Sequence, residues 1–280
     1  MALVSQRQTW GSMAGVESWA QRLAPEPFRD FLPYTSASAL KVIHVTQVAR
    51  RAIDVARHAS TNLDRDRHAA ELHASLNAAG LGDQLSVATE PTARLNSAKL
   101  NEVERRLVGE RVLALYFHLL HWDGPWFLDL RPRHFGWDRA KARLTFTPSS
   151  LWYQPEPDFV RRVRSLYAGF YRKDPSELAA GIELYRWDSK PSAGFEQRVE
   201  TLLREHFGPG DASEICFSIA HFRATFDAIF HEAASSRAKF HPDLTFLGVE
   251  LIGLYLTLES LAVPLSPRRA FDKAQPAGLR

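Results

Sequence analysis

Residues 121–138, HWDGPWFLDLRPRHFGWD, combine acidic, basic and aromatic side chains at a density that suits neither a buried strand nor an exposed loop. Asp129 follows an apolar run, and Arg131, Arg133 and His134 come two, four and five residues after it. A carboxylate beside two guanidinium groups can accept a hydroxyl proton while the cations hold a phosphate. The same spacing also suits a structural ion-pair cluster, which is the interpretation that spacing alone favours.

Other residues that could do chemistry do not complete a known motif. His231 and Glu232 begin like a zinc-protease helix, but Ser235 stands where the second histidine is required. His118 and His121 are three residues apart and have no Cys or carboxylate at a defined spacing. The chain also has no Gly-x-Ser-x-Gly elbow and no glycine-rich phosphate loop. We therefore predict no metal site.

Composition narrows the class of protein. The chain has 280 residues, 45% of them hydrophobic, and a net charge of +3 without a basic tract, so no nucleic-acid partner is expected. The single cysteine, Cys216, lies in an apolar helical pattern and is predicted to be a buried structural thiol. One cysteine allows no internal disulfide, which favours an intracellular protein.

Membrane insertion is not expected either. The N-terminus has no uninterrupted apolar segment of the signal-peptide kind. The most apolar stretch, residues 244–263, is interrupted by Glu250 and Glu259, which favours a buried helix over a membrane span. We therefore expect a cytoplasmic protein, with a peripheral position at the inner face of a membrane as the alternative. Arg161, Arg162 and Arg164 form a basic patch that is either a solvated helix face or a contact for anionic lipid.

The hydrophobic pattern predicts a mostly helical chain with a few short strands. Residues 40–45 fit either a short strand or the start of a helix, and 142–153 fit a short strand that runs into a loop at Pro148. Helices are predicted over 46–79, with Asn62 or Asp64 capping a second one, and over 100–121, 159–172 and 242–262. Two more are predicted to begin at caps formed by Asp174 and Asp211.

The segment from Asp123 to His134, DGPWFLDLRPRH, resembles the catalytic loop of the AarF/UbiB family of atypical protein-kinase-like proteins, which is linked to ubiquinone biosynthesis. Asp123, Gly124, Asp129 and Pro132 fall on matching positions. The loop is also similar to the GDLRPGN form of aminoglycoside-phosphotransferase-like kinases. The resemblance extends over about residues 100–271. It implies a kinase-like fold of the α+β class, with a reduced N-terminal lobe over 1–95, a helical C-terminal lobe over 96–272 and a flexible tail over 273–280.

The resemblance also implies roles for individual residues. Asp129 takes the place of the catalytic carboxylate, and His134 takes the place of the asparagine that holds the metal. Lys41 becomes the counterpart of the lysine that contacts ATP, and Arg131 and Arg133 become candidates for binding the nucleotide. His68 stands where the family has a glutamate.

Two departures from the family pattern argue against catalysis. A neutral imidazole at His134 is a poor ligand for Mg²⁺, and Pro148–Ser150 replace the Asp-Phe-Gly segment, so both metal ligands are lost. Their loss removes several kcal/mol of transition-state stabilisation. We predict a non-catalytic pseudokinase that acts as an interaction or scaffold protein for a protein partner, near lipid or quinone metabolism by family analogy, without a cofactor.

Two alternatives remain open at this point. One is an active ATP- and Mg²⁺-dependent kinase or ATPase that uses Lys41, Asp129 and His134. The other is a binder of a small molecule or lipid in the old nucleotide cleft, whose predicted lining is Trp122, Trp126, Phe127 and Trp152.

Overall fold

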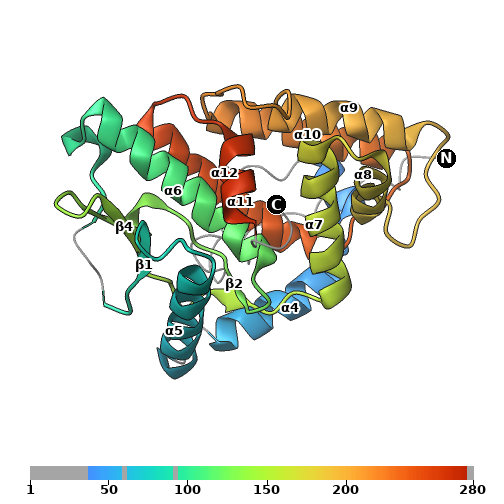
Figure 1. Cartoon of the computed structure of the whole chain (residues 1–280). Coiled ribbons are helices and arrows are strands. Elements are labelled where there is room, and N and C mark those ends of the chain that lie inside the picture. Colours follow the sequence, from blue (N-terminus) through green and yellow to red (C-terminus); the bar gives the residue numbers. More distant parts are fainter. Residues whose placement is uncertain (1–36, 59–61, 91–93, 276–280) are drawn as a thin grey trace, which may run out of the picture.

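A computed structural model describes residues 37–58, 62–90 and 94–275 of the chain. It is mostly helical with small mixed sheets, which confirms the predicted α+β class (Figure 1). Residues 1–36 of the predicted N-terminal lobe and the last five residues of the predicted tail lie outside the described residues. The helices are α3 (Ala37–Val42), α4 (Val45–His58), α5 (Asn62–Ala78), α6 (Glu102–His121), α7 (Pro157–Arg172), α8 (Pro175–Ile182), α9 (Phe195–Phe207), α10 (Ile219–Ser235), α11 (Leu244–Leu261) and α12 (Pro267–Ala274).

The strands form two small sheets beside the helices. They are β1 (Leu85–Val87), β2 (Trp126–Phe127), β3 (Phe135–Asp138), β4 (Arg143–Phe146) and β5 (Trp152–Tyr153). In the first sheet β4 lies between β1, to which it is parallel, and β3, to which it is antiparallel. In the second, β2 and β5 pair antiparallel, with Trp126 opposite Tyr153. The short strand predicted to run into a loop at Pro148 is therefore confirmed as β4.

Helix α6 is the central element of the core. Its N-terminus is fixed by a capping box in which Asn101 accepts from the backbone N–H of Glu104 and the Glu104 carboxylate accepts from that of Asn101. From residue 111 to 120 every side chain is buried, because α7, α11 and α12 all contact it. The predicted single apolar face is thus wrong for this half, and Val103, assigned to that face, is 69% exposed.

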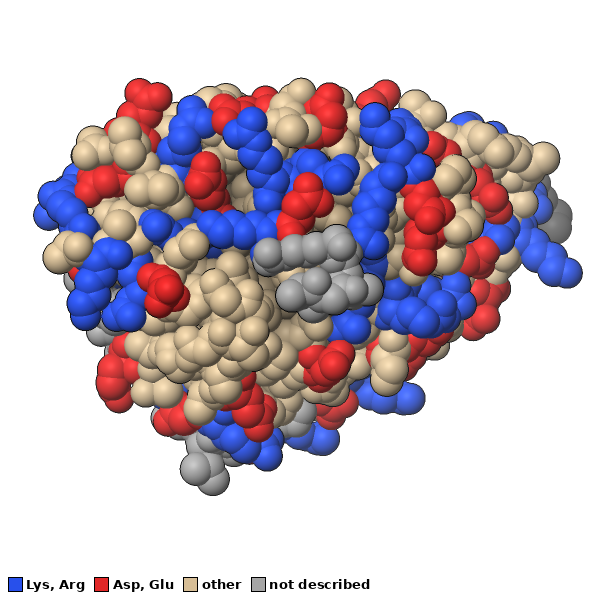
Figure 2. Space-filling view, in the orientation of Figure 1, with Lys and Arg blue, Asp and Glu red and all other residues tan. Residues whose placement is uncertain are grey.

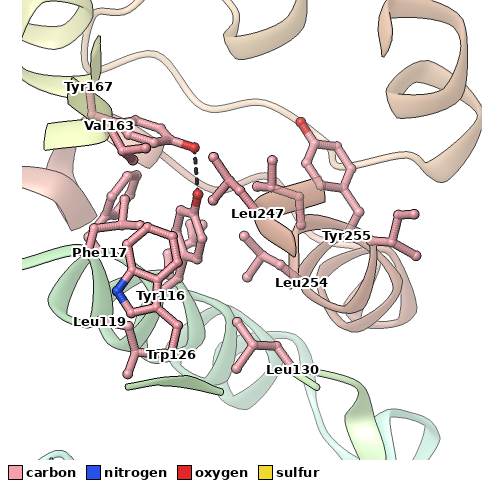
Figure 3. Packing of buried hydrophobic residues seen from close by; sticks show 14 of the residues in the cluster. Tyr116, Phe117, Leu119, Trp126, Leu130, Val163, Tyr167, Leu247, Leu254 and Tyr255 are labelled. Carbon is pink, nitrogen blue, oxygen red and sulfur yellow. Dashed lines mark hydrogen bonds between the residues drawn. The ribbon is translucent and has the colours of Figure 1, made fainter. Parts of the chain in front are cut away.

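Figure 3 shows how α6, α7 and α11 meet in the core. The hydroxyl groups of Tyr116 on α6 and Tyr167 on α7 are hydrogen-bonded at 2.5 Å, which satisfies two polar groups that are otherwise surrounded by apolar side chains. Leu247 and Leu254 of α11 are buried beside them. Helix α11 is the one described helix long and apolar enough to cross a membrane, but 78% of that stretch is buried inside the protein, so the predicted buried helix is confirmed.

Helices α7 and α8 pack unusually close together. The helix predicted over 159–172 is confirmed, and Asp174 caps α8 by accepting from the backbone N–H groups of Ser176 and Glu177, as predicted. Glycine makes the contact possible: a Cβ atom at Gly169 would lie 2.2 Å from the backbone nitrogen of Leu178. At Gly181 it would lie 2.4 Å from the Cα atom of Leu166.

Because both clashes are with backbone atoms, side-chain rotation cannot relieve them. We expect Gly181→Ala to lower the free energy of unfolding by about 1–3 kcal/mol, measured by urea titration, through forced separation of the two helices. The control is Ala179→Ser on the exposed side of α8, which should change stability by less than about 0.5 kcal/mol. Equal stability of Gly181→Ala and the native chain would contradict this close helix contact.

Two further predictions from the sequence are wrong. The helix predicted to begin at Asp211 begins at Ile219, with Ser218 as its cap, and Asp211 instead accepts from the backbone of Ser213 in a turn. Residue 215 pairs antiparallel with Leu265, which holds this segment extended. As a result Cys216 is exposed, not buried.

The N-terminal helices follow the sequence pattern more closely. Residues 40–45 do not form a strand: 40–42 are the end of helix α3, Ile43 and His44 connect it to α4, and Val45 is the first residue of α4. The helical pattern over 46–79 becomes α4 and α5, as predicted. Helices α9 and α12 were not predicted from the sequence.

Candidate functional site

The loop that carries Asp129 runs between β2 and the short 3-10 helix η3 (Pro132–His134), and is held on both sides. The backbone N–H of Leu128 donates to the carbonyl of Leu151 at 3.0 Å, at the start of β5. From α11, the hydroxyl of Thr257 donates to the carbonyl of Leu130 at 2.6 Å. Gly253, one turn earlier on α11, lets the helix approach so closely that a Cβ atom there would lie 3.0 Å from the Leu130 nitrogen. The loop backbone is thus fixed by buried contacts.

Asp129 is almost completely buried, with 1% of its surface exposed, and it accepts hydrogen bonds on both carboxylate oxygens. Arg131 donates to both oxygens in a bidentate pair: its Nε lies 2.7 Å from Oδ1 and its Nη2 lies 2.6 Å from Oδ2. The backbone N–H of Arg131 also donates to Oδ1 at 3.2 Å. Oδ2 is reached in addition by Nη2 of Arg133 at 2.8 Å and by Nε2 of His134 at 2.9 Å. Five donor groups therefore surround the carboxylate.

These contacts determine the charge of Asp129. Burial by itself would raise the pKa of its carboxyl group, but the hydrogen bonds from Arg131 and His134, and the charges that they carry, outweigh burial and hold the pKa far below its usual range. Asp129 is therefore a permanent carboxylate. With about four lone-pair positions and five donors around it, no position is left to accept a proton from a substrate hydroxyl.

His134 links this loop to the segment after β4. Its Nδ1 lies 3.0 Å from the carbonyl oxygen of Thr147, and the Thr147 N–H donates to the His134 carbonyl at 2.8 Å. The Thr147 carbonyl and the Asp129 carboxylate are both acceptors, so a ring nitrogen that carries a proton can donate to the one it faces. Nε of Arg133 also lies 3.2 Å from His134 Nε2, and this contact needs that nitrogen as an acceptor, so it competes with donation to Asp129. Residues 129–134 and 147–150 thus lie together.

The other residues singled out from the sequence lie elsewhere. Lys41 is exposed at the end of α3, which packs against α10, and its carbonyl accepts from the side chain of Lys239. It is not among the groups that contact Asp129. His68 lies on α5, where its ring meets Trp152 edge to face at 4.6 Å. The structure therefore brings Arg131, Arg133 and His134 to Asp129, but not Lys41.

The aromatic residues suggested as a cleft lining mostly fill the core. Trp126 and Phe127 are completely buried, and Trp152 is 7% exposed. Trp122 stacks on Phe127 with a distance of 6.1 Å between the ring centroids. It also lines the surface groove that is described below. In addition, the described part of the chain has no group of three or more His, Cys, Asp or Glu side chains placed to hold a metal ion.

Neither models of known protein families nor curated proteins match this chain. The loop must therefore be interpreted from its own geometry. That geometry is one of an ion-pair cluster built to hold the loop together, the interpretation that the spacing of Asp129 and its arginines favours.

Sequence reasoning missed the residues that hold the loop from outside. Thr257 and Gly253 lie about 125 positions after it, and nothing in their local pattern marks them as its support. The one usable signal is that Gly253 and Thr257 are four residues apart, and so lie on one face of a predominantly apolar helix.

Proposed function

We propose that this chain is a non-catalytic, kinase-like protein, related to the AarF/UbiB family, that acts by binding a protein partner. One observation carries the proposal: the carboxylate of Asp129 is buried and saturated by Arg131, Arg133 and His134. A catalytic aspartate in a kinase must face the acceptor hydroxyl and have an oxygen available for it.

The kinase-like part of the proposal is supported by the order and contacts of two segments. In protein kinases, the catalytic loop and the Asp-Phe-Gly segment meet at the metal. Here the corresponding segments, 129–134 and 147–150, meet through His134 and Thr147. No carboxylate stands in the second segment, and the cation Arg131 occupies the space beside Asp129 that a metal would need. The link to lipid or quinone metabolism, and a position at a membrane surface, follow only from the resemblance.

The test is nucleotide turnover and binding. We expect the purified chain to show no Mg²⁺-dependent ATP hydrolysis and no rise in melting temperature with ATP that requires Mg²⁺, because both metal ligands are replaced. The comparison variant is Lys41→Met, which removes the proposed nucleotide lysine at an exposed position and so leaves the fold intact. Mg²⁺-dependent hydrolysis by the native chain would overturn the proposal in favour of an active kinase or ATPase, and its loss in Lys41→Met would add that Lys41 takes part.

A further inference from the structure

A groove of about 600 Å³ lies along α7, beside the end of α6. Its lining comes from α7 and from the segments 121–124 and 154–157, with one further contribution each from α8 and residue 275. Figure 2 shows Lys and Arg side chains interspersed with Asp and Glu over the face on which α7 and α12 lie in Figure 1. Three arginines line the groove, Arg161, Arg164 and Arg172, and none of them takes part in the Asp129 cluster.

These arginines share one stripe of α7. The spacing from Arg161 to Arg164, Ala168 and Arg172 is three, four and four residues, so all face the same side of the helix. Ala168 between them is small and leaves room in the floor of the groove. At 1.5 Å per residue, the stripe from Arg161 to Arg172 is about 16 Å long.

Each guanidinium has a partner that a ligand could replace in part. Arg164 is anchored by the carbonyls of Leu120 at 2.7 Å and Trp122 at 3.3 Å, and it also donates to Asp123 at 2.8 Å. The Asp123 side chain is 91% exposed, so this ion pair is weak and exchangeable. Arg161 pairs with Asp158 on its own helix, and Arg172 donates to Gln275.

The remaining titratable groups of the groove leave its character cationic. His121 adds no charge at neutral pH, because burial first and the nearby Arg164 second lower its pKa to about 4. Asp123 and Glu177 line the groove and Asp158 pairs with Arg161 and Arg162 beside it, so three carboxylates stand against the guanidinium groups of Arg161, Arg162, Arg164 and Arg172. A ligand with carboxylates would therefore be attracted, and it would exchange one carboxylate for another at Arg161 and Arg164.

The shape of the stripe selects among anions. Guanidinium groups that lie along a line do not converge on one point, as a single phosphate would require. Arg164 is recessed, with 31% of its side chain exposed, so a flat membrane surface would not reach it. An extended peptide advances about 3.3 Å per residue, so about five residues span the stripe. Carboxylates four positions apart, about 13 Å, match the separation between Arg164 and Arg172, about 12 Å along the helix.

We propose that this groove binds an extended acidic segment of a partner protein, with two carboxylates four residues apart and apolar residues between them. Trp122, Pro155 and Val160 supply the apolar contacts, and Arg161 with Arg164 at one end and Arg172 at the other bind the carboxylates. The inference rests on the proposed role as an interaction protein, and it names the surface and the kind of partner.

The test uses the full chain and a fluorescein-labelled heptapeptide, Gly-Asp-Leu-Gly-Leu-Asp-Gly, in a polarisation titration at low ionic strength. We expect saturable binding that Arg161→Gln and Arg172→Gln each weaken about tenfold, since each loses a charged hydrogen bond. Both side chains are exposed, so these variants should fold, which circular dichroism checks. Arg223→Gln on the exposed side of α10 is the matched control and should bind as the native chain does.

The peptide with both Asp residues changed to Asn, and one with the two Asp residues adjacent, should bind at least about tenfold more weakly. Equal binding by the arginine variants, equal binding of the Asn peptide, or preference for phosphatidic-acid vesicles or inorganic phosphate would overturn the inference. ATP hydrolysis by the same preparation separates the two proposals: turnover would overturn the non-catalytic function, whereas a loss of arginine dependence alone would overturn only the peptide groove.

Discussion

Replacing Asp129 by alanine is expected to lower the free energy of unfolding by about 3–5 kcal/mol. The substitution leaves the guanidinium of Arg131, which is 8% exposed, without its bidentate carboxylate. Breaking a buried ion pair from one side is costly because the remaining charge stays buried without compensation. Urea titration at neutral pH measures the effect as a shift of the unfolding midpoint at constant slope.

Two companion variants separate the buried pair from its exposed neighbour. Arg133, whose side chain is 37% exposed, contributes through a partly solvated pair, so Arg133→Gln should cost no more than about 1 kcal/mol. The double variant Asp129→Leu with Arg131→Met removes both charges and should recover much of the stability lost by Asp129→Ala. A cost below about 1 kcal/mol for Asp129→Ala would mean that Asp129 is not the structural acceptor that we describe.

The pH dependence of this effect has a definite sign. The pKa of Asp129 in the folded chain lies far below its ordinary value of 3.8. A group with a depressed folded pKa stabilises the fold above its unfolded pKa, and this stabilisation is lost as the pH falls through the folded pKa. The stability difference between the native chain and Asp129→Asn should therefore be constant at neutral pH and should shrink steadily below about pH 4.

Local signals predicted the parts of this fold that local physics determines. The buried face of α7, with Phe159, Val163 and Phe170, repeats at helical spacing, and Asp174 followed by a proline marks the start of α8. The ion-pair character of the Asp129 loop was also visible, because Arg131 and Arg133 lie within four residues of the carboxylate. Each of these structures depends on residues that are close in the sequence.

What the sequence could not predict depends on distant partners. Asp211 has the form of a helix cap, but the bridge between residue 215 and Leu265, 50 residues away, keeps the segment extended. The same contact exposes Cys216, whose neighbours suggested a core position. Helix α9 is a different case, because Phe195, Val199, Leu202, Leu203 and Phe207 recur at helical spacing and could have predicted it from the sequence.

The groove along α7 shows the same division. Arg161 and Arg164 were noticed as a basic patch because they are close in sequence. Arg172 lies on the same face of the helix as these two arginines, which can be seen only once the bounds of the helix are known. The opposite wall of the groove is formed by residues 121–124. The partners of Asp129 could thus be predicted from local spacing. The arginines of the groove could be brought together only by knowing the helix face and its tertiary contacts.

The second large effect is expected at Glu250, a carboxyl group in the middle of α11. It is completely buried, and neither carboxylate oxygen has a hydrogen-bond partner among the described residues. Phe246, one turn earlier, stacks on Tyr153 at 4.7 Å, so the group lies in an aromatic part of the core. Burial raises the pKa of Glu250 well above its ordinary value of 4.5, which keeps the group protonated in the folded chain.

The consequence is a loss of stability with rising pH. Between the unfolded pKa, near 4.5, and the raised folded pKa, folding must return a proton to Glu250, which costs up to about 1.4 kcal/mol per pH unit. Glu250→Gln has the same shape and no proton to lose, so its stability should not carry this slope. The measurement is the unfolding free energy of both chains between pH 5 and 8, compared as a difference at each pH.

The control is Glu205→Gln, an exposed carboxylate on α9, which should follow the native chain at every pH. Tyr116 and Tyr153 near Glu250 stay neutral throughout, because burial raises the pKa of both hydroxyl groups well above 10. Buried histidines such as His118 and His206, whose pKa burial lowers to about 4 and about 3, also make stability depend on pH, but they are common to both chains and cancel in the difference. The slope of the difference can therefore be assigned to Glu250. A difference between native and Glu250→Gln that stays flat from pH 5 to 8 would show that the carboxyl is ionised and satisfied in the folded chain, and that α11 tolerates a charge in its core.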